Sequence, residues 1–394
     1  MTVAILSDSP ALTTGFARTT ARIAGSLARH HEVHCYGIKG GHGDIHDDLG
    51  YYVWPGERGG HWSAQLGQFF KQTRPDVLLL NMDAKNALEC VTRCRAAGLT
   101  APIVSYVCFD GLPVSRRYLD AQRDCAAVWA TSGPGAAYLR AEGIPVTGIA
   151  PPGVDSAEFA PLPDKMALRC TIGLESSFLV GVFAANTERK QLPRAIAGFA
   201  KAAAVLRDAD TRLYLHCRRD GYWDLVELAQ RYGVAERMIM LDGYSEARGV
   251  PLATAQGPRA ASMRDLGYAD RIALCDIVVN TPYSGDVEQV ILEANACGVP
   301  LVHTDDEGVM RDAAGTGAAL LSAADVGTGP LGEARHHVSP ARIADELVRL
   351  ATDARARADL IARGNANAAR FPWSALEQAS LAMVAPFTAP KGNG

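Results

Sequence analysis

Residues 277–303 have the sequence IVVNTPYSGDVEQVILEANACGVPLVH, and this stretch decides the fold. An apolar run, Ile277–Asn280, leads through a loop of Gly and acidic residues into a short helical stretch, Val290–Cys297. Gly298 then precedes a second apolar run, Pro300–His303. Two apolar runs separated by a helix are typical of a βαβ unit, whose parallel strands are covered on both faces. The stretch therefore predicts a parallel α/β sheet.

The same alternation repeats along all 394 residues. Further strands are expected in the first half at Val3–Leu6, Val33–Gly37, Val77–Leu80, Ile103–Val107, Val128–Thr131 and Val146–Ala150. In the second half they are expected at Phe178–Phe183, Leu213–Cys217, Met238–Leu241 and Ala319–Leu321. Amphipathic stretches that separate these runs include Ala17–His30, Ala84–Ala97 and Leu192–Leu206. The chain is therefore predicted to form two tandem Rossmann-like, doubly wound domains that face a central cleft.

Pro and Gly residues cluster at Pro151–Pro163, where the periodicity lapses, so a domain boundary is expected there. We predict a first domain over residues 1–155 and a second over residues 165–370. Two loops, Gly40–Gly50 and Tyr244–Ser262, are rich in turn-forming residues, and the last residues, Ala389–Gly394, are expected to fray.

Composition narrows the class of protein. The formal net charge of -4 provides no global basic field for nucleic acid or anionic lipid, and no apolar run approaches the roughly 20 residues of a membrane span. The chain begins directly with a strand, so no signal peptide is expected. Nine scattered cysteines without a second pair at metal-ligand spacing indicate reduced thiols. A cytoplasmic protein is the resulting expectation.

A loop with two adjacent cations follows the first strand of the second half. It runs from Ala184 to Gln191 and contains Asn186, Arg189 and Lys190 just before a helix. Arg and Lys at a helix N-terminus suit a diphosphate, because the guanidinium supplies a fork of donors and the ammonium a compact charge. The alternative is a pair of surface cations that simply face water.

The loop inside the opening stretch is the second candidate for ligand binding. Gly285, Asp286, Val287 and Glu288 precede a short helix, and backbone N–H groups at such a place can hold a phosphate or sugar oxygen. Glu293 lies on that helix, and a carboxylate there can accept two hydrogen bonds from vicinal hydroxyls. A donor that contains a diphosphate and a sugar ring would use the backbone N–H groups for its phosphate oxygens and the carboxylate for its hydroxyls.

In the first half, the segment Ser7–Ala17 follows strand one and opens a helix, so Gly15 would let backbone N–H groups approach an oxygen-rich ligand. A plain strand-to-helix connection is equally compatible. The cluster His42–Asp48 contains metal-ligand residue types, but a solvated loop is the favoured interpretation and no metal site is expected. His216 and His303 are interpreted as satisfied strand-end residues.

Four segments together resemble a known family. Leu292–Pro300 resembles the LEAMACGxPVV signature of retaining glycosyltransferases with two Rossmann-like domains (GT-B fold, group 1, glycogen-synthase-like). Pro151–Asp155 with Phe159 and Pro161 resembles the family's PNGVDxxxFxP. Asn186–Lys190 resembles its RKN/RKQ donor loop, and Phe371–Trp373 resembles the F.W that precedes a helix crossing back to the first domain, here residues 371–388. The segments keep the family's order and cover nearly the whole chain.

The resemblance implies a hexosyl- or pentosyltransferase whose substrate is a nucleotide-sugar donor, UDP- or GDP-linked, with no obligatory cofactor. Glu293 would bind the ribose and Lys190 the diphosphate, with Arg189 beside it, and both cations would stabilise the leaving group. Three positions depart from the family. Ala184-Ala185 replaces a Gly-Arg, Gly285 replaces a Glu, with Asp286 as the neighbouring carboxylate, and Asp110 stands where many members have a His. Asp110 would orient the acceptor or serve as an N-cap.

The sequence does not decide which molecule carries the acceptor hydroxyl. The three classes considered are a small metabolite or natural product, a cell-surface precursor, and a modified base in DNA. A nucleic-acid acceptor would need a basic strip, with Arg18, Arg22, Arg116 and Arg117 as the candidates. Other activities on the same fold are a nucleotide-sugar epimerase and a phosphorylase. A non-catalytic protein that binds sugar nucleotides is the third alternative, and the sequence predicts no oligomeric state.

Overall fold

The computed structural model describes residues 1–40, 47, 49–56, 61–207, 209–219, 221–240, 263 and 266–388. The chain forms two compact units. The first unit comprises Met1–Gly153, Pro330–Glu333 and Trp373–Gly394, and the second comprises Val154–Gly329 and Ala334–Pro372. The loops predicted at Gly40–Gly50 and Tyr244–Ser262 and the tail predicted at Ala389–Gly394 lie largely or wholly outside the described residues.

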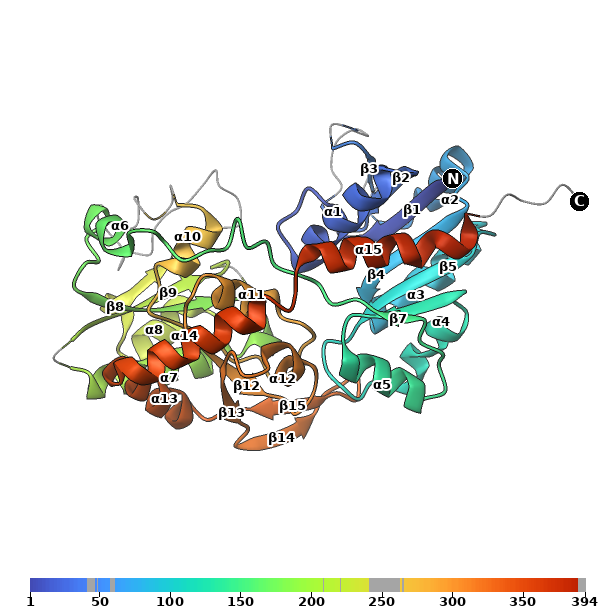
Figure 1. The fold of residues 1–394 in the computed structure, drawn as a ribbon. Helices are drawn as coiled ribbons and strands as arrows, with labels where there is room; N and C mark the ends of the chain where they lie inside the picture. The colour runs from blue at the N-terminus through green and yellow to red at the C-terminus, as the bar shows by residue number, and fades with distance from the viewer. Residues whose placement is uncertain are drawn as a thin grey trace, which may run out of the picture. The chain divides into compact units, whose positions relative to one another are not determined.

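The first unit contains a seven-stranded parallel sheet of order β3-β2-β1-β4-β5-β6-β7 (Figure 1). Its strands are β1 (Thr2–Ser7), β2 (Glu32–Gly37), β3 (Tyr52–Pro55), β4 (Val77–Asp83), β5 (Ile103–Cys108), β6 (Ala127–Ala130) and β7 (Gly148–Ile149). Its helices are α1 (Gly15–Ala28), α2 (Leu66–Thr73), α3 (Ala84–Ala96), α4 (Asp120–Arg123) and α5 (Gly133–Ala141). On β1, Val3 and Ile5 pack into one core cluster, while Ala4 and Leu6 pack into another. Both faces of the sheet are therefore covered, as continuous apolar strands require.

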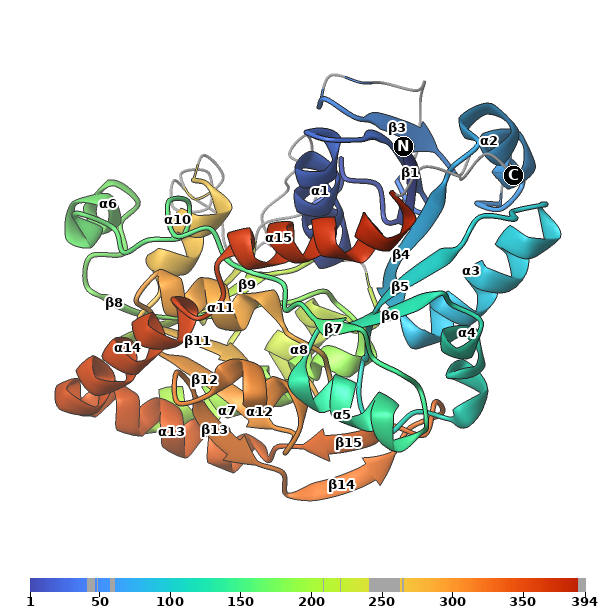
Figure 2. The same ribbon diagram turned by 45° about the vertical axis from the view of Figure 1, so that its right-hand side comes forward.

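The C-terminal helix α15 (Trp373–Val384) packs on α1 within the first unit, as both Figure 1 and Figure 2 show. Leu376, Met383 and Val384 of α15 share a core cluster with Ile23 and Leu27 of α1. The hydroxyl of Ser26 also donates to the carbonyl oxygen of Glu377 at 3.0 Å. The last helix thus completes the core of the unit in which the chain begins.

The second unit contains a six-stranded parallel sheet of order β10-β9-β8-β11-β12-β13. Its strands are β8 (Ser177–Phe183), β9 (Asp210–His216), β10 (Met238–Met240), β11 (Ile277–Asn280), β12 (Leu301–Asp305) and β13 (Ala319–Ser322). Its helices include α6 (Lys165–Thr171), α7 (Leu192–Val205), α8 (Leu225–Arg231), α10 (Tyr268–Ala273), α11 (Gln289–Ala296), α12 (Val309–Ala314), α13 (Pro340–Thr352) and α14 (Ala354–Ala368). Successive residues of β11 alternate between the two core clusters, with Val278 in one and Ile277 and Val279 in the other. The prediction of two tandem parallel α/β domains is confirmed.

Several elements differ from the expectation. The strand predicted at Val146–Ala150 is only Gly148–Ile149 in the structure, because it lies at the edge of the sheet and pairs only with Trp129 and Ala130 of β6. The antiparallel hairpin of β14 (Asp325–Thr328) and β15 (Ala334–His337) was not predicted. Its residues are mostly polar and only partly buried, so the sequence has no apolar alternation that would mark the two strands.

The structure also bears on membrane-spanning helices, metal sites and disulfides. Among the described residues, no helix combines the length and the apolar character that a membrane crossing needs. Within the same residues, no three His, Cys, Asp or Glu side chains gather as a metal site would require, and the candidate cluster His42–Asp48 is outside them except for Asp47. All nine cysteines are free thiols.

Candidate functional site

The two predicted donor-loop cations are placed by a single turn of 3-10 helix in the second unit. The turn, η2 (Glu188–Lys190), follows β8 and ends at Gln191, whose φ of 49° lies in the left-handed region and lets α7 begin in a new direction. The Gln191 side chain fixes this bend, because its Nε2 donates to the carbonyl oxygen of Thr281 at 3.1 Å. Its Oε1 lies 2.8 Å from Nδ1 of His337. Arg189 and Lys190 are therefore held on a turn that is anchored to two other segments.

Both cations contact the carboxylate of Glu288, the residue just before α11. Arg189 Nη1 lies 2.5 Å from Glu288 Oε1, and Lys190 Nζ contacts Oε2. Arg189 Nη1 also donates to the carbonyl oxygen of Ser284 at 2.8 Å. The structure thus brings together the two segments that the sequence indicated separately, the cationic loop and the Gly/acid loop.

The electrostatics of this cluster hold Glu288 ionised. Burial alone raises the pKa of its carboxyl group, but the charges of Lys190 and Arg189 outweigh burial and leave the pKa well below the usual range. The side chains of Glu288 and Lys190 are 11% and 9% exposed, so the ion pair lies in a largely desolvated environment. The site therefore contains a largely buried ion pair of Lys190 and Glu288, with the partly exposed Arg189 on the same carboxylate.

Gly285 lies directly against this cluster. A Cβ on residue 285 would lie 2.6 Å from Glu288 Oε1, 2.9 Å from Arg189 Nη1 and 3.0 Å from the sulfur of Met310. The Glu288 carboxylate therefore lies against the position that the Cβ atom of residue 285 would occupy. The sequence placed both Asp286 and Glu288 in the ligand loop, but it indicated only Asp286 as the replacement carboxylate and did not predict that Glu288 contacts the cations. Val287 packs against the core of the unit.

Glu293 is buried on α11, with 3% of its surface exposed. The hydroxyl of Tyr268 donates to its Oε2 at 3.0 Å. The Tyr268 ring in turn lies 4.9 Å from the ring of His216, and the ring of Phe183 stacks on His216 at 5.5 Å. An aromatic group built from α10, β9 and β8 therefore adjoins this carboxylate. Sequence analysis did not identify it, because its members are far apart in the chain.

The imidazole of His216 is neutral in the folded chain. Burial, helped by the charge of Arg271, lowers its pKa from 6.5 to about 4. Its Nδ1 lies 3.0 Å from the Tyr214 hydroxyl. A neutral ring can stack on Phe183 without the desolvation cost of a buried charge.

This shift predicts a specific loss of stability in acid. Because the pKa of His216 is lower in the folded than in the unfolded chain, its contribution to stability is complete above 6.5 and is lost as the pH falls through about 4. Between about pH 7 and about pH 4, the unfolding free energy of the unchanged protein should fall by about 2 kcal/mol more than that of His216→Gln. This value is reduced for partial solvent exposure. Urea denaturation at the two pH values measures this, and equal losses in both proteins would contradict it.

Asn186 is placed as a brace within the protein. Its Nδ2 donates to the carbonyl oxygens of Arg218, Arg219 and Trp223 at 3.2, 3.2 and 2.9 Å, and its Oδ1 accepts from the Trp223 N–H at 3.0 Å. The side chain is buried, and a Cβ on Gly221 would overlap it at 2.5 Å. The amide therefore joins the cationic loop to the loop that follows β9.

A row of polar side chains lies at the carboxyl ends of β11 and β12. Asn280 and His303 are register partners, so their side chains lie on the same face of the sheet. Within the described part of the chain, both amide atoms of Asn280 and Nε2 of His303 have no hydrogen-bond partner, although both residues are buried. Burial lowers the pKa of His303, and the charges of Glu288 and Lys190 act on it. Unused donors and acceptors thus lie near the ion cluster, where buried polar groups normally find a partner.

The remaining predicted site residues belong to the first unit. Gly15 is exposed as the first residue of α1, whose N-terminus is capped by the Thr14 hydroxyl, an acceptor of the Ala17 N–H at 3.1 Å. Asp110 is exposed after β5. Burial and the nearby charge of Asp110 raise the pKa of Asp83 at the end of β4. The structure therefore brings Asp110 close to a second carboxylate, which the sequence analysis had not paired with it.

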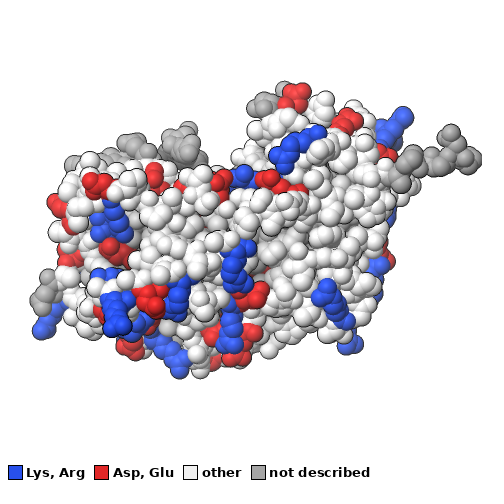
Figure 3. Space-filling view, in the orientation of Figure 1, with Lys and Arg blue, Asp and Glu red and all other residues white. Residues whose placement is uncertain are grey.

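The arginines considered for a basic strip contact groups of the first unit. Arg22 lies over the Trp373 ring at 5.6 Å, Arg116 pairs with Glu142 at 3.0 Å, and Arg117 lies over the Tyr118 ring at 4.6 Å. On the face shown in Figure 3, Lys and Arg side chains are interspersed with Asp and Glu. That face has no continuous basic strip of the kind that follows a phosphate backbone.

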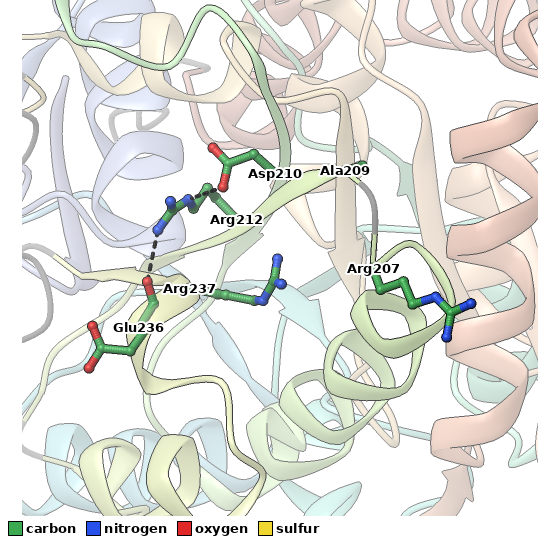
Figure 4. A pocket seen from close by; sticks show the side chains of 6 residues that line it. All are labelled: Arg207, Ala209, Asp210, Arg212, Glu236 and Arg237. Carbon is green, nitrogen blue, oxygen red and sulfur yellow. Dashed lines mark hydrogen bonds and ion pairs between the residues drawn. The ribbon is translucent and has the colours of Figure 1, made fainter.

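A hollow of about 370 Å³ lies in the second unit but away from the residues above (Figure 4). It is lined by Arg207, Ala209, Asp210, Arg212, Glu236 and Arg237. Arg212 pairs with Asp210 at 2.8 Å and donates to the carbonyl oxygen of Glu236 at 2.8 Å. The hollow lies where β9 and β10 begin, whereas ligands of doubly wound sheets bind where strands end. We therefore assign the candidate site to the cluster around Arg189, Lys190, Glu288 and Glu293.

No protein-family model matches the chain. D-inositol 3-phosphate glycosyltransferase of Stackebrandtia nassauensis is 31% identical over 237 residues, which cover 57% of this chain and 45% of that protein. The match thus spans less than half of the relative.

Solved structures match over almost the whole chain. HepE of Anabaena in complex with UDP-glucose has a TM-score of 0.70 at 16% identity, covering 98% of this chain and 100% of that one. WaaG, a glycosyltransferase of lipopolysaccharide biosynthesis, has a TM-score of 0.68 at 16% identity over 97% and 99%. Sucrose-phosphate synthase of Thermosynechococcus elongatus has 0.69 at 13% identity over 98% of each chain. The chain therefore has the fold of the two-domain GT-B glycosyltransferases, with two tandem Rossmann-like domains that are each built on a parallel sheet.

Proposed function

We propose that the chain is a glycosyltransferase that moves a sugar from a nucleotide-sugar donor to an acceptor hydroxyl, with retention of the anomeric configuration. The observation that carries the proposal is that Arg189 and Lys190 meet at Glu288, the residue just before α11, and that Glu293 is buried on this helix. The two cations suit a diphosphate, and the Glu293 carboxylate suits vicinal hydroxyls. A ligand that combines both groups matches this arrangement.

The comparisons support a UDP-linked donor. HepE has been solved with UDP-glucose, and the trehalose-6-phosphate protein of E. coli with UDP-2-fluoro glucose, and both share this fold with TM-scores of 0.70 and 0.65. The partial sequence match is to a protein named for glycosyl transfer. A nucleotide sugar is then a substrate, and the reaction requires no further cofactor.

The cations would act when the bond from the sugar to the diphosphate breaks. Negative charge then develops on the leaving phosphate, and the Arg189 guanidinium and the Lys190 ammonium stabilise it. The carbonyl oxygen of Ser284 holds the guanidinium in position. The leaving phosphate oxygen takes the proton of the acceptor hydroxyl on the face that the phosphate vacates. In this scheme no side chain of the protein needs to act as a base.

Glu293 would bind the ribose of the donor. Its Oε2 accepts one hydrogen bond from Tyr268, and a carboxylate has capacity for further bonds from vicinal hydroxyls. The aromatic group of Tyr268, His216 and Phe183 beside it provides flat apolar surfaces next to the ribose position. Asp110 of the first unit is proposed to orient the acceptor hydroxyl.

Donor consumption tests the proposal. The intact chain is incubated with UDP- and GDP-sugars, with and without a panel of hydroxyl acceptors, and both released nucleotide and glycosylated product are measured. We expect release of the nucleotide to depend on an acceptor, and NMR of the product to show the anomeric configuration of the donor. Interconversion of the sugar without acceptor would indicate an epimerase instead, and an inverted product would contradict retention.

A further inference from the structure

A carboxylate of the protein itself already lies between the two cations proposed to bind the donor diphosphate. Glu288 Oε1 lies 2.5 Å from Arg189 Nη1, and Oε2 contacts Lys190 Nζ. The Glu288 side chain is 11% exposed. Before any ligand arrives, an internal anion therefore occupies the position that suits a phosphate oxygen.

The surroundings are shaped to admit this carboxylate. A Cβ on residue 285 would lie 2.6 Å from Glu288 Oε1, so any side chain there would require the carboxylate to shift. The Arg189 Nη1 that contacts the carboxylate also donates to the Ser284 carbonyl oxygen, so the ion pair and the loop are held together. The arrangement is built into the fold of both segments.

The orientation of Glu288 is a second sign. Glu288 is the N-cap residue of α11, yet its side chain makes no capping hydrogen bond. The residues that usually cap a helix from this position are Ser, Thr, Asp and Asn, and Glu is not among them. The Glu288 carboxylate contacts the two cations and not the first turn of α11.

Charge balance excludes simultaneous occupation. The two cations supply two positive charges, and the diphosphate of a nucleotide sugar carries about two negative charges at neutral pH. If Glu288 stayed in place, the desolvated cluster would hold an excess negative charge, which is costly away from water. Diphosphate and carboxylate must therefore compete for Arg189 and Lys190.

We propose that Glu288 is a resident counter-ion of the Arg189–Lys190 pair and that a diphosphate displaces it on binding. That the diphosphate belongs to a sugar donor rests on the proposed function, whereas the exchange itself follows from the geometry. The carboxylate offsets part of the positive charge of the pair when no ligand is bound, and it lowers the affinity for any anion.

Calorimetric titration tests the exchange. Inorganic pyrophosphate, UDP and GDP are titrated into the intact chain, Glu288→Gln, and the matched control Glu346→Gln, which removes a carboxylate paired with Arg349 on α13. We expect Glu288→Gln to bind pyrophosphate and the accepted nucleotide about tenfold more tightly than the unchanged protein. Glu346→Gln should bind as the unchanged protein does. Equal or weaker binding by Glu288→Gln would overturn the proposal, because Glu288 would then orient the cations for the ligand.

The outcomes separate this proposal from the proposed function. Tighter pyrophosphate binding by Glu288→Gln without binding of any nucleotide would support the counter-ion and contradict the nucleotide-sugar activity. If a nucleotide binds and Glu288→Gln does not tighten that binding, the nucleotide-sugar activity is supported and the counter-ion proposal is contradicted. If no anion binds to any of the proteins, both proposals fail.

A second measurement uses the unchanged protein, in case Glu288→Gln does not fold. Crystal structures of the intact chain are determined without ligand and with the nucleotide that binds. We expect the Glu288 carboxylate to contact Lys190 Nζ without ligand and to lie beyond about 4 Å from it in the complex. An ion pair that persists beside the bound diphosphate would overturn the exchange.

Discussion

Lys190→Ala is expected to lower the turnover of the nucleotide sugar about 10³-fold. Lys190 contributes a desolvated ammonium at the place proposed for the leaving diphosphate, and its side chain is 9% exposed. Charge that develops in such an environment is stabilised far more strongly than in water, so the loss corresponds to about 4 kcal/mol in the barrier. Steady-state rates of donor consumption, compared as kcat/KM, measure the effect.

The control for Lys190→Ala is Lys201→Ala, which removes an exposed lysine from α7 in the same unit. Its turnover should equal that of the unchanged protein. Lys190→Arg keeps the charge but replaces a compact ammonium with a planar fork, so an intermediate loss is expected. If Lys190→Ala keeps more than about a tenth of the activity while remaining folded, the ammonium does not stabilise the leaving group.

Asn186→Ala is expected to lower the unfolding free energy of the second unit by about 4 kcal/mol. The change removes four side-chain hydrogen bonds, to Arg218, Arg219 and Trp223, and leaves their backbone groups without these partners in a buried place. Each bond contributes about 1 kcal/mol net. Chemical denaturation followed by tryptophan fluorescence measures the loss.

Asn186→Asp provides a sharper form of the same prediction. Aspartate has the same shape, but its carboxylate oxygens would face the three carbonyl oxygens that now accept from Nδ2. Asn186→Asp should therefore destabilise at least as strongly as Asn186→Ala. Asn365→Ala, on the exposed side of α14, is the control and should change stability by less than about 0.5 kcal/mol. An Asn186→Asp protein as stable as the original would show that the brace is not needed.

The sequence predicted the two parallel sheets because their strands are short apolar runs buried on both faces. Four strands begin within about a residue of the expected position, namely β1, β4, β8 and β11. This difference is no larger than the usual uncertainty in where an element ends. β14 and β15 escaped prediction for the opposite reason. They form a partly exposed hairpin of polar residues, so neither the apolar alternation nor a two-residue turn marks them.

The candidate site was only partly accessible from the sequence. Arg189 and Lys190 could be singled out because two adjacent cations precede a helix, and Glu293 because it lies in the segment that resembles the family signature. The contact between Glu288 and the cations could not, since it joins positions about a hundred residues apart whose meeting depends on the order of β8 and β11 in the sheet.

Asn186 illustrates a related limit. Its place in the cationic loop suggested contact with a ligand, and the structure instead shows its amide bonded to the loop after β9. A donor-rich side chain can serve a ligand or the backbone, and only the neighbouring carbonyl groups decide which. Those neighbours belong to another strand connection and are invisible in the local sequence.

The central claim is that the second unit binds a nucleoside diphosphate through the α11 segment, and calorimetric titration of the intact chain with UDP and GDP tests it most directly. One of the two nucleotides should bind at a single site, and Glu293→Ala should weaken that binding about 100-fold, because hydrogen bonds to a buried carboxylate are lost. Glu227→Ala, an exposed change on α8, should leave the affinity unchanged. Failure of both nucleotides to bind, or equal affinities in Glu293→Ala and the unchanged protein, would contradict the account.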